Sequence, residues 1–167
     1  YYLGADAQFR TFLTAITGLL FSPSRGLFVF SPFLLCLMLF GFKQTNIPGK
    51  SYLFIAVLWP VLHCLLLATR ADWWGGYSFG PRYMTDCIPG LFLLGVSCWP
   101  TIKSSALYRY SIISSIIFSV FVHTWQGRFN INAALHWNER YDVAGHQSET
   151  VKNISDWSIA QCVYPKN

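Results

Sequence analysis

The sequence predicts an all-α fold, an integral membrane bundle of about four transmembrane helices with an amphipathic N-terminal helix and a polar exoplasmic tail. Hydrophobic residues make up 53% of the 167 residues and charged residues only 11%, whereas soluble domains carry about 25% charged residues. The mean hydropathy is +0.37. Uncharged apolar segments alternate with short polar turns along most of the chain. Together these observations indicate that lipid surrounds much of the protein.

The segment 1–20 has the periodicity of an amphipathic helix, with apolar and polar residues on different faces. The apolar face holds Phe9, Leu13, Ile16 and Leu20, and the other face holds Arg10, Thr14 and Thr17. Such a helix can lie flat at the membrane interface or pack on neighbouring helices. The sequence leaves both alternatives open.

The predicted membrane spans are apolar segments close to the ~20 residues that cross a bilayer. They are residues 27–42, 52–69, 83–99 and 107–125. Proline is tolerated near a helix start and inside membrane helices. We therefore expect one helix through Ser31-Pro32 in the first span, a kink at Pro60 in the second and an interruption at Pro89-Gly90 in the third.

Two features inside these spans are candidates for a polar function. An intramembrane histidine such as His63 marks a functional site by default, although packing against a neighbouring carbonyl is the favoured interpretation. Four small or polar residues recur at every fourth position of the last span, and they favour close helix packing over a polar pathway. These residues are Ser111, Ser115, Ser119 and His123.

The chain becomes polar after the last span, so we divide it into a transmembrane region, 1–126, and an exoplasmic tail, 127–167. The tail is expected to be ordered because it carries aromatic residues to bury, namely Trp137, Tyr141, Trp157 and Tyr164. Its acidic and histidine residues are too loosely spaced for a metal site, and we expect neither a metal nor a cofactor. They are His136, Glu139, Asp142 and His146.

The distribution of basic residues predicts the orientation in a cell membrane. The turns at 43–50 and 100–109 carry lysine or arginine and no acid, and four spans place them on one side. The cytoplasmic loops of membrane proteins carry an excess of lysine and arginine, so we expect these two turns on the cytoplasmic side. The loop 70–82 and the tail then face outward. The basic residues are scattered singly along the chain, which argues against nucleic acid as a partner.

The segment from Arg70 to Asp86 concentrates glycine, aromatic and charged residues between two spans. Glycine allows tight turns, indole rings stack on sugar faces, and arginine presents a planar fork of donors to phosphate oxygens. With the arginine of the first outward turn, this segment supplies the candidate substrate-binding residues. They are Arg25, Asp72, Trp73, Trp74, Gly75, Gly76, Arg82, Tyr83 and Asp86.

The charges at this membrane edge need a partner or a task, because a charge at membrane depth costs at least ~2.5–3.5 kcal/mol. Arg82 and Asp86 are four residues apart and are expected on one helical face. Either they pair and pin the loop, or Asp86 orients Arg82 toward an anionic lipid head group. Arg25 either joins this anion site or contacts ordinary lipid phosphates.

Two stretches, Gly18 to Pro32 and Asp72 to Tyr83, resemble the C-terminal half of bacterial multi-pass glycosyltransferases of the GT-C type, which are related to dolichyl-phosphate-mannose–protein mannosyltransferases. The tail sequence Ser155-Asp156-Trp157-Ser158 with Gln161 is also similar to the end of such proteins. The resemblance covers the chain from about residue 18 onward. It implies that further N-terminal helices of the same protein are missing from this sequence.

The resemblance implies transfer of a sugar from a polyprenyl-phosphate donor on the outer face of the membrane. Arg82, with Arg25, would stabilise the leaving lipid phosphate, and Trp73 and Trp74 would flank the sugar or the lipid head group. The family places its catalytic acid in an outward loop that nothing here matches, so the catalytic residue is unassigned and the fragment is expected to be inactive alone. The alternatives are a transporter or flippase for lipid-linked sugar, and a non-catalytic membrane scaffold subunit.

Overall fold

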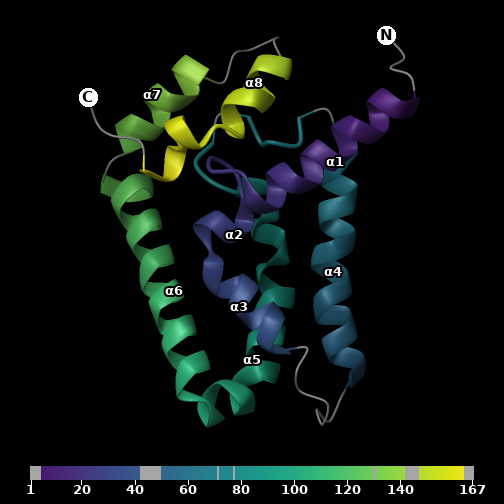
Figure 1. The fold of residues 1–167 in the computed structure, drawn as a ribbon, viewed down its shortest axis with the longest axis vertical. Coiled ribbons are helices and arrows are strands. Elements are labelled where there is room, and N and C mark those ends of the chain that lie inside the picture. Colours follow the sequence, from purple (N-terminus) through teal and green to yellow (C-terminus); the bar gives the residue numbers. More distant parts are fainter. Residues whose placement is uncertain are drawn as a thin grey trace.

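The computed structural model describes residues 5–41, 50–70, 72–76, 78–129, 131–141 and 147–163. Over these residues the chain is all-α, without a strand, which confirms the predicted class (Figure 1). The α-helices are α1 (Ala5–Phe21), α2 (Leu27–Phe30), α3 (Pro32–Gly41), α4 (Lys50–Ala68), α5 (Ile88–Ser104), α6 (Ala106–Thr124), α7 (Ile131–Tyr141) and α8 (Gln147–Ile154). Tighter or wider turns are the 3₁₀ segments η1 (Arg82–Cys87), η3 (Trp157–Ile159) and η4 (Gln161–Val163) and the π-turn η2 (Trp125–Phe129).

The helices form a bundle with a cap at one end. Helices α3, α4, α5 and α6 run along the long axis of the molecule (Figure 1). α4 packs on α5, α5 on α3, and α3 on α6. At one end α1, the turn 22–26, the described residues of 70–87, α7 and α8 gather into what we call the cap. The described residues of the loop 70–82 and of the tail therefore lie at the same end of the bundle.

The proline positions explain two differences from the predicted spans. Residues 27–41 form two helices instead of one, because Pro32 has no N–H and the backbone of Ser31 leaves the helical region at φ −138°, ψ 63°. In the third span Pro89 does not interrupt the helix. It lies in the first turn of α5, where its missing N–H is not needed, and the residues before it form η1. Pro60 lies inside α4, which continues past it.

One helical stretch among the described residues, Ala106–Phe129, is long and apolar enough by length and composition to cross a membrane. It comprises α6 and η2, spans 24 residues and has a hydropathy of 1.3. Thr11–Phe21 and Phe54–Ala68 are shorter apolar helices. The positions of the fourth and second predicted helices agree with α6 and α4, while the multi-pass topology stays a prediction.

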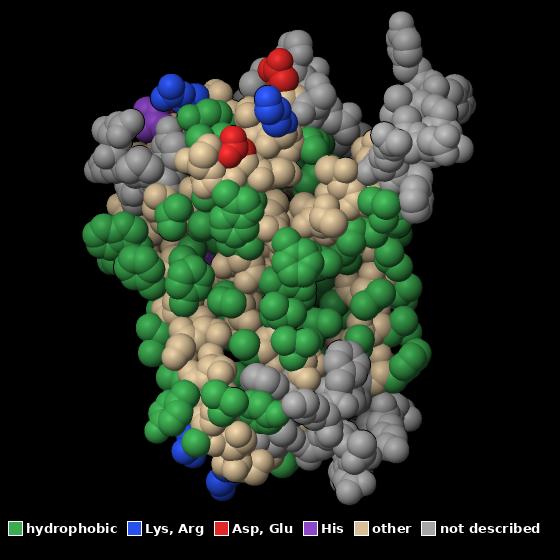
Figure 2. Space-filling model, in the orientation of Figure 1, with side chains coloured by type: hydrophobic (Ala, Val, Ile, Leu, Met, Phe, Trp, Pro, Cys, Tyr) green, Lys and Arg blue, Asp and Glu red, His purple; other side chains and the backbone are tan. Residues whose placement is uncertain are grey.

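The long helices carry large apolar side chains on their outer surfaces as well as in the core. In the view of Figure 2, apolar side chains cover the middle of the molecule and charged side chains appear at its two ends. The most exposed apolar side chains of α4, α5 and α6 include Phe54, Leu66, Phe92, Val96, Leu107 and Ile117. Burial therefore does not explain the composition of these helices.

The core beneath the cap is built around an indole ring. Trp73 is only 1% exposed and packs against α1, where Gly18 leaves room for the ring. Ala15 and Leu19 of α1 are also buried in this core. Of the two alternatives for the first helix, packing on neighbouring helices therefore holds for this inner face. Leu13, expected on the apolar face, is 45% exposed. Phe9 lies among the side chains that are not described.

We expect Gly18→Ala to destabilise the protein, because a Cβ there would lie 2.2 Å from Cη2 of Trp73. Overpacking of this kind costs about 1–3 kcal/mol, which should lower the Tm measured by tryptophan fluorescence. Thr17→Ala is the matched control, since Thr17 is the exposed neighbour whose hydroxyl bonds only to its own helix. Equal melting temperatures for the two variants would show that the indole does not depend on this space.

Candidate functional site

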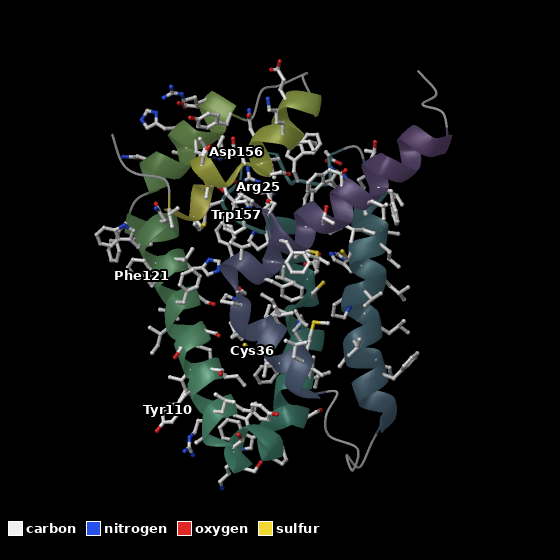
Figure 3. The ribbon with its side chains drawn as sticks, viewed as in Figure 1. Arg25, Cys36, Tyr110, Phe121, Asp156 and Trp157 are labelled. Atoms are coloured by element: carbon white, nitrogen blue, oxygen red, sulfur yellow. The ribbon has the colours of Figure 1, made fainter. Side chains whose placement is uncertain are left out.

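The turn between α1 and α2 places Arg25 inside the cap. The Ser22 Oγ accepts hydrogen bonds from the N–H groups of Ser24 (3.3 Å) and Arg25 (2.8 Å), which closes the turn. The backbone N–H of Gly26 donates to the Ser22 carbonyl at 2.8 Å. The Arg25 side chain is 1% exposed and points into the interior of the cap (Figure 3).

The guanidinium of Arg25 binds the backbone of the loop that was predicted to hold substrate. Its Nε donates to the Trp74 carbonyl at 3.0 Å, and one Nη2 hydrogen goes to the Gly76 carbonyl at 3.1 Å. Its Nη1 also donates to the Ser24 carbonyl at 3.0 Å. The guanidinium carbon lies 5.2 Å from the centre of the Trp137 ring. One side chain thus joins the turn, the loop and α7.

Two amide side chains complete the arginine's partners. Nη2 donates to Asn138 Oδ1 at 3.0 Å, and Nη1 donates to Gln161 Oε1. The Gln161 amide also accepts from the Gly80 N–H and donates to the Ser78 carbonyl, both at 3.2 Å. A guanidinium has five N–H donors, and these contacts use all of them. Arg25 therefore holds the loop and has no free donor for a ligand, contrary to its expected part in an anion site.

The two tryptophans of the loop lie at different depths. Trp73 is inside the core, so it cannot stack on a sugar at the surface. Its position therefore differs from the role that the resemblance implied. Trp74 is half-buried and contacts Trp73 edge to face at 5.9 Å between ring centres. Gly75 and Gly76 have φ values of +86° and +59°, a region that favours glycine. The glycines thus serve the tight turn that their residue type allows.

The exposed side of the loop carries an ion pair. Arg70 contacts Asp72 through two hydrogen bonds of 3.0 and 3.1 Å, and the Tyr83 hydroxyl donates to the same carboxylate at 3.3 Å. The hydrogen bonds from Arg70 hold the pKa of Asp72 below its usual value. Both partners are more than half exposed, so solvent screens the pair and it contributes little stability. Its geometry fixes Asp72 beside Tyr83.

The predicted pair between Arg82 and Asp86 does not form. These residues lie in a 3₁₀ helix, where residues three apart eclipse each other, and a residue four further on points to a different side. Arg82 is exposed, and its guanidinium makes no hydrogen bond or ion pair with any residue that the structure describes. The adjacent Tyr83 carbonyl lies 2.8 Å from His63 Nε2, which supports the packing interpretation of that histidine.

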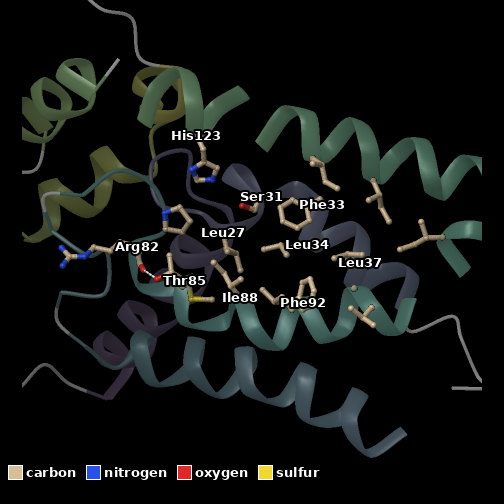
Figure 4. Close-up of a pocket in the computed structure, with 18 of the residues that line it drawn as sticks. Leu27, Ser31, Phe33, Leu34, Leu37, Arg82, Thr85, Ile88, Phe92 and His123 are labelled. Carbon is tan, nitrogen blue, oxygen red and sulfur yellow. Dashed lines mark hydrogen bonds between the residues drawn. The ribbon is translucent and has the colours of Figure 1, made fainter. Parts of the chain in front are cut away.

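An apolar cavity of about 740 Å³ opens between α2–α3, η1, α5 and α6. Arg82 and Thr85 stand at one end, and the guanidinium extends away from the apolar wall (Figure 4). From there the cavity follows α5 past Phe92 to Ile102, near the opposite end of the bundle. The polar side chains on its lining are Ser31, Arg82, Thr85 and His123. The sequence analysis did not predict this cavity, because its lining comes from four separated segments.

The serine row of α6 packs against α3, as predicted. Ser115 and Ser119 donate to carbonyls one turn back on their own helix, at 2.7 and 2.9 Å. The Ser115 hydroxyl lies 3.6 Å from the Cys36 sulfur of α3. His123 departs from the pattern, because it lines the cavity. Among the described residues no group of three or more potential ligands is arranged to hold a metal ion, and Asp142 and His146 lie outside those residues.

No protein-family model matches the sequence, and comparisons with curated proteins and with solved structures found no significant similarity.

We expect Arg25→Lys to lower the free energy of unfolding by about 3 kcal/mol or more, because an ammonium cannot reach this set of planar acceptors, and each one left unpaired costs about 1–3 kcal/mol. Arg70→Lys, at the exposed pair, should change it by less than about 1 kcal/mol. Thermal or denaturant unfolding of the two variants side by side measures the difference. Similar losses in the free energy of unfolding of both variants would mean that the buried contacts of Arg25 stabilise the protein no more than the exposed pair does.

Proposed function

We propose that this chain is part of an integral membrane glycosyltransferase and binds a polyprenyl-phosphate-linked sugar at the exoplasmic surface. The observation that carries the proposal is the apolar cavity that ends at Arg82. A cavity with apolar walls and a single cation at its end is complementary to a long hydrocarbon chain with an anionic head group. The sugar-transfer step rests on the resemblance in the loop and the turn.

A bilayer around the bundle accounts for its outer surface. Helices α4, α5 and α6 expose apolar side chains over the middle of the molecule, and contiguous surfaces of this kind mark contact with membrane or protein. Along α6 and η2 the residues between Arg109 and Arg128 include no Asp, Glu, Lys or Arg, and this stretch rises about 27 Å at 1.5 Å per residue. That length is close to the ~30 Å of a hydrocarbon core.

The charges at the two ends support the predicted orientation. Lys103 in the last turn of α5 and Arg109 in the first turn of α6 place two basic residues and no acid where these helices meet, which favours the cytoplasmic side. The cap carries both signs of charge, including the Arg70–Asp72 pair. In this orientation Arg82 lies near the exoplasmic head groups, where a polyprenyl phosphate presents its anion.

The transfer reaction breaks the bond between the anomeric carbon of the sugar and a phosphate oxygen, and it joins that carbon to an acceptor hydroxyl oxygen. The polyprenyl phosphate leaves with the bonding electron pair, and the guanidinium of Arg82 stabilises the charge that develops on it. The proton of the acceptor hydroxyl passes to a carboxylate base. We place this base outside the cavity, because no Asp or Glu is among the residues that line it.

Replacing Arg82 with Ala should weaken the binding of polyprenyl phosphate to the chain in lipid nanodiscs by about 10- to 100-fold, because hydrogen bonds to a charged group contribute about 1.5–3 kcal/mol. In the full-length protein the same variant should abolish sugar transfer from a radiolabelled donor without affecting membrane insertion. Arg128→Ala is the control, since Arg128 is exposed and does not line the cavity. Unchanged binding in Arg82→Ala would end the proposed role. A transporter or scaffold would bind the lipid without transferring the sugar.

The orientation predicts opposite labelling of the two ends of the bundle. Lys152 on α8 and Lys103 at the end of α5 are both exposed. In intact cells, a membrane-impermeant thiol reagent should label Lys152→Cys, whereas Lys103→Cys should react only after permeabilisation. The reverse pattern would place the cap in the cytoplasm and remove the basis for exoplasmic transfer.

A further inference from the structure

His123 is held at the wall of the cavity by aromatic neighbours. Its ring centre lies 5.9 Å from that of Phe30 and 6.3 Å from that of Phe79, which meets it edge to face. Phe79 can approach the end of α6 because residue 127 is a glycine, where a Cβ would lie 3.1 Å from the Phe79 ring. Packing thus fixes the imidazole beside the cavity, and neither ring nitrogen bonds to any residue in the described part of the chain.

Ser31 adds a second unused polar group to the same wall. Its backbone N–H donates to the Leu27 carbonyl at 2.8 Å as α2 ends. Its hydroxyl lines the cavity and has no hydrogen-bond partner among the described residues. Figure 4 shows Ser31 and His123 on the same side of the cavity, across from Ile88 and Phe92. Ser31 directly follows α2 and His123 lies on α6, and these two helices are in contact.

These groups restrict what can occupy this part of the cavity. A hydrocarbon chain laid against Ser31 and His123 would remove water from both and offer no hydrogen bond, which costs about 1–3 kcal/mol for each group. An oxygen-rich ligand would satisfy them. The neighbouring ring of Phe79 also lines the cavity, and an aromatic face beside hydrogen-bonding groups suits the mixed apolar and hydroxyl surface of a sugar.

We propose that Ser31, Phe79 and His123 form the subsite for the sugar of the lipid-linked ligand, with the imidazole and the hydroxyl bonded to sugar hydroxyl groups. The inference rests on the proposed function, and it moves the sugar from Trp73, which is buried, to the α2–α6 wall. The phosphate then lies at Arg82, the sugar beside His123, and the prenyl chain along α5.

The test compares two probes in nanodiscs that contain the chain: a bacterial polyprenyl phosphate, and the same lipid carrying one hexose. The wild-type chain should bind the hexose-bearing lipid more tightly. His123→Phe preserves the aromatic packing and removes both nitrogens, and Ser31→Ala removes the hydroxyl. Each should reduce the preference for the hexose by about 3- to 10-fold, the worth of one hydrogen bond, and leave affinity for the bare lipid phosphate unchanged. His136→Phe, on the exposed face of α7, is the matched control and should retain the preference.

The outcomes separate this inference from the function it rests on. If Arg82→Ala loses both lipids while His123→Phe and Ser31→Ala keep the full preference for the hexose, the sugar subsite is wrong and the anion site stands. A wild-type chain that binds both lipids equally also overturns the subsite alone. If the wild-type chain binds neither lipid, both proposals fail. If His123→Phe melts at a lower temperature than the control, His123→Leu, which also removes both nitrogens, provides a second variant with the same expected loss of preference.

Discussion

The cap depends on the burial of one guanidinium. A charged group taken out of water costs several kcal/mol unless every donor finds a partner. Arg25 meets this condition with carbonyl groups of the loop and with the amides of Asn138 and Gln161. The loop backbone, α7 and the tail must therefore occupy fixed positions before the arginine is stabilised. That requirement keeps the glycine-rich loop in one conformation, and with it the 3₁₀ turn that presents Arg82.

The rest of the bundle is organised by the contrast between its ends and its middle. Polar groups are concentrated in the cap, where they bond to each other, while α4, α5 and α6 present apolar side chains both inward and outward. Small residues allow close approach between helices. Gly90 lies where a Cβ would be 3.2 Å from the Ala56 carbonyl of α4. The cavity lies on the other side of α5, where side chains of α3, α5 and α6 line it.

Periodicity and composition were sufficient to predict the helical class and the positions of α4 and α6, because long apolar segments allow few alternatives. They failed where a local rule depended on context. Four-residue spacing predicted a contact between Arg82 and Asp86 only if the segment was α-helical, and the tighter 3₁₀ turn removed it. Pro89 was read as an interruption, although it lies at a position where a helix needs no N–H. Trp73 was predicted to bind substrate. Nothing in the sequence showed that Gly18, 55 positions earlier, leaves space for its ring in the core.

The candidate site was predicted only in part for the same reason. Arg82 was predicted from its residue type and its place beside an apolar segment. The cavity and the pairing of Ser31 with His123 on one wall arise from contacts between separate helices, which no spacing rule encodes. Asn138 carried no sequence signal at all, because its role is defined by the arginine that it faces.

The bond between Arg25 and Gln161 joins residues 136 positions apart, and this separation has a consequence for biosynthesis. Chains are made and inserted from the N-terminus, and contacts between distant positions form late. The turn that carries Arg25 is synthesised long before Gln161. Until Gln161 arrives, the guanidinium keeps its hydration and the loop lacks its anchor. The hydrogen bonds of the buried guanidinium are therefore completed only after the residues around Gln161 have been synthesised and have packed against the turn.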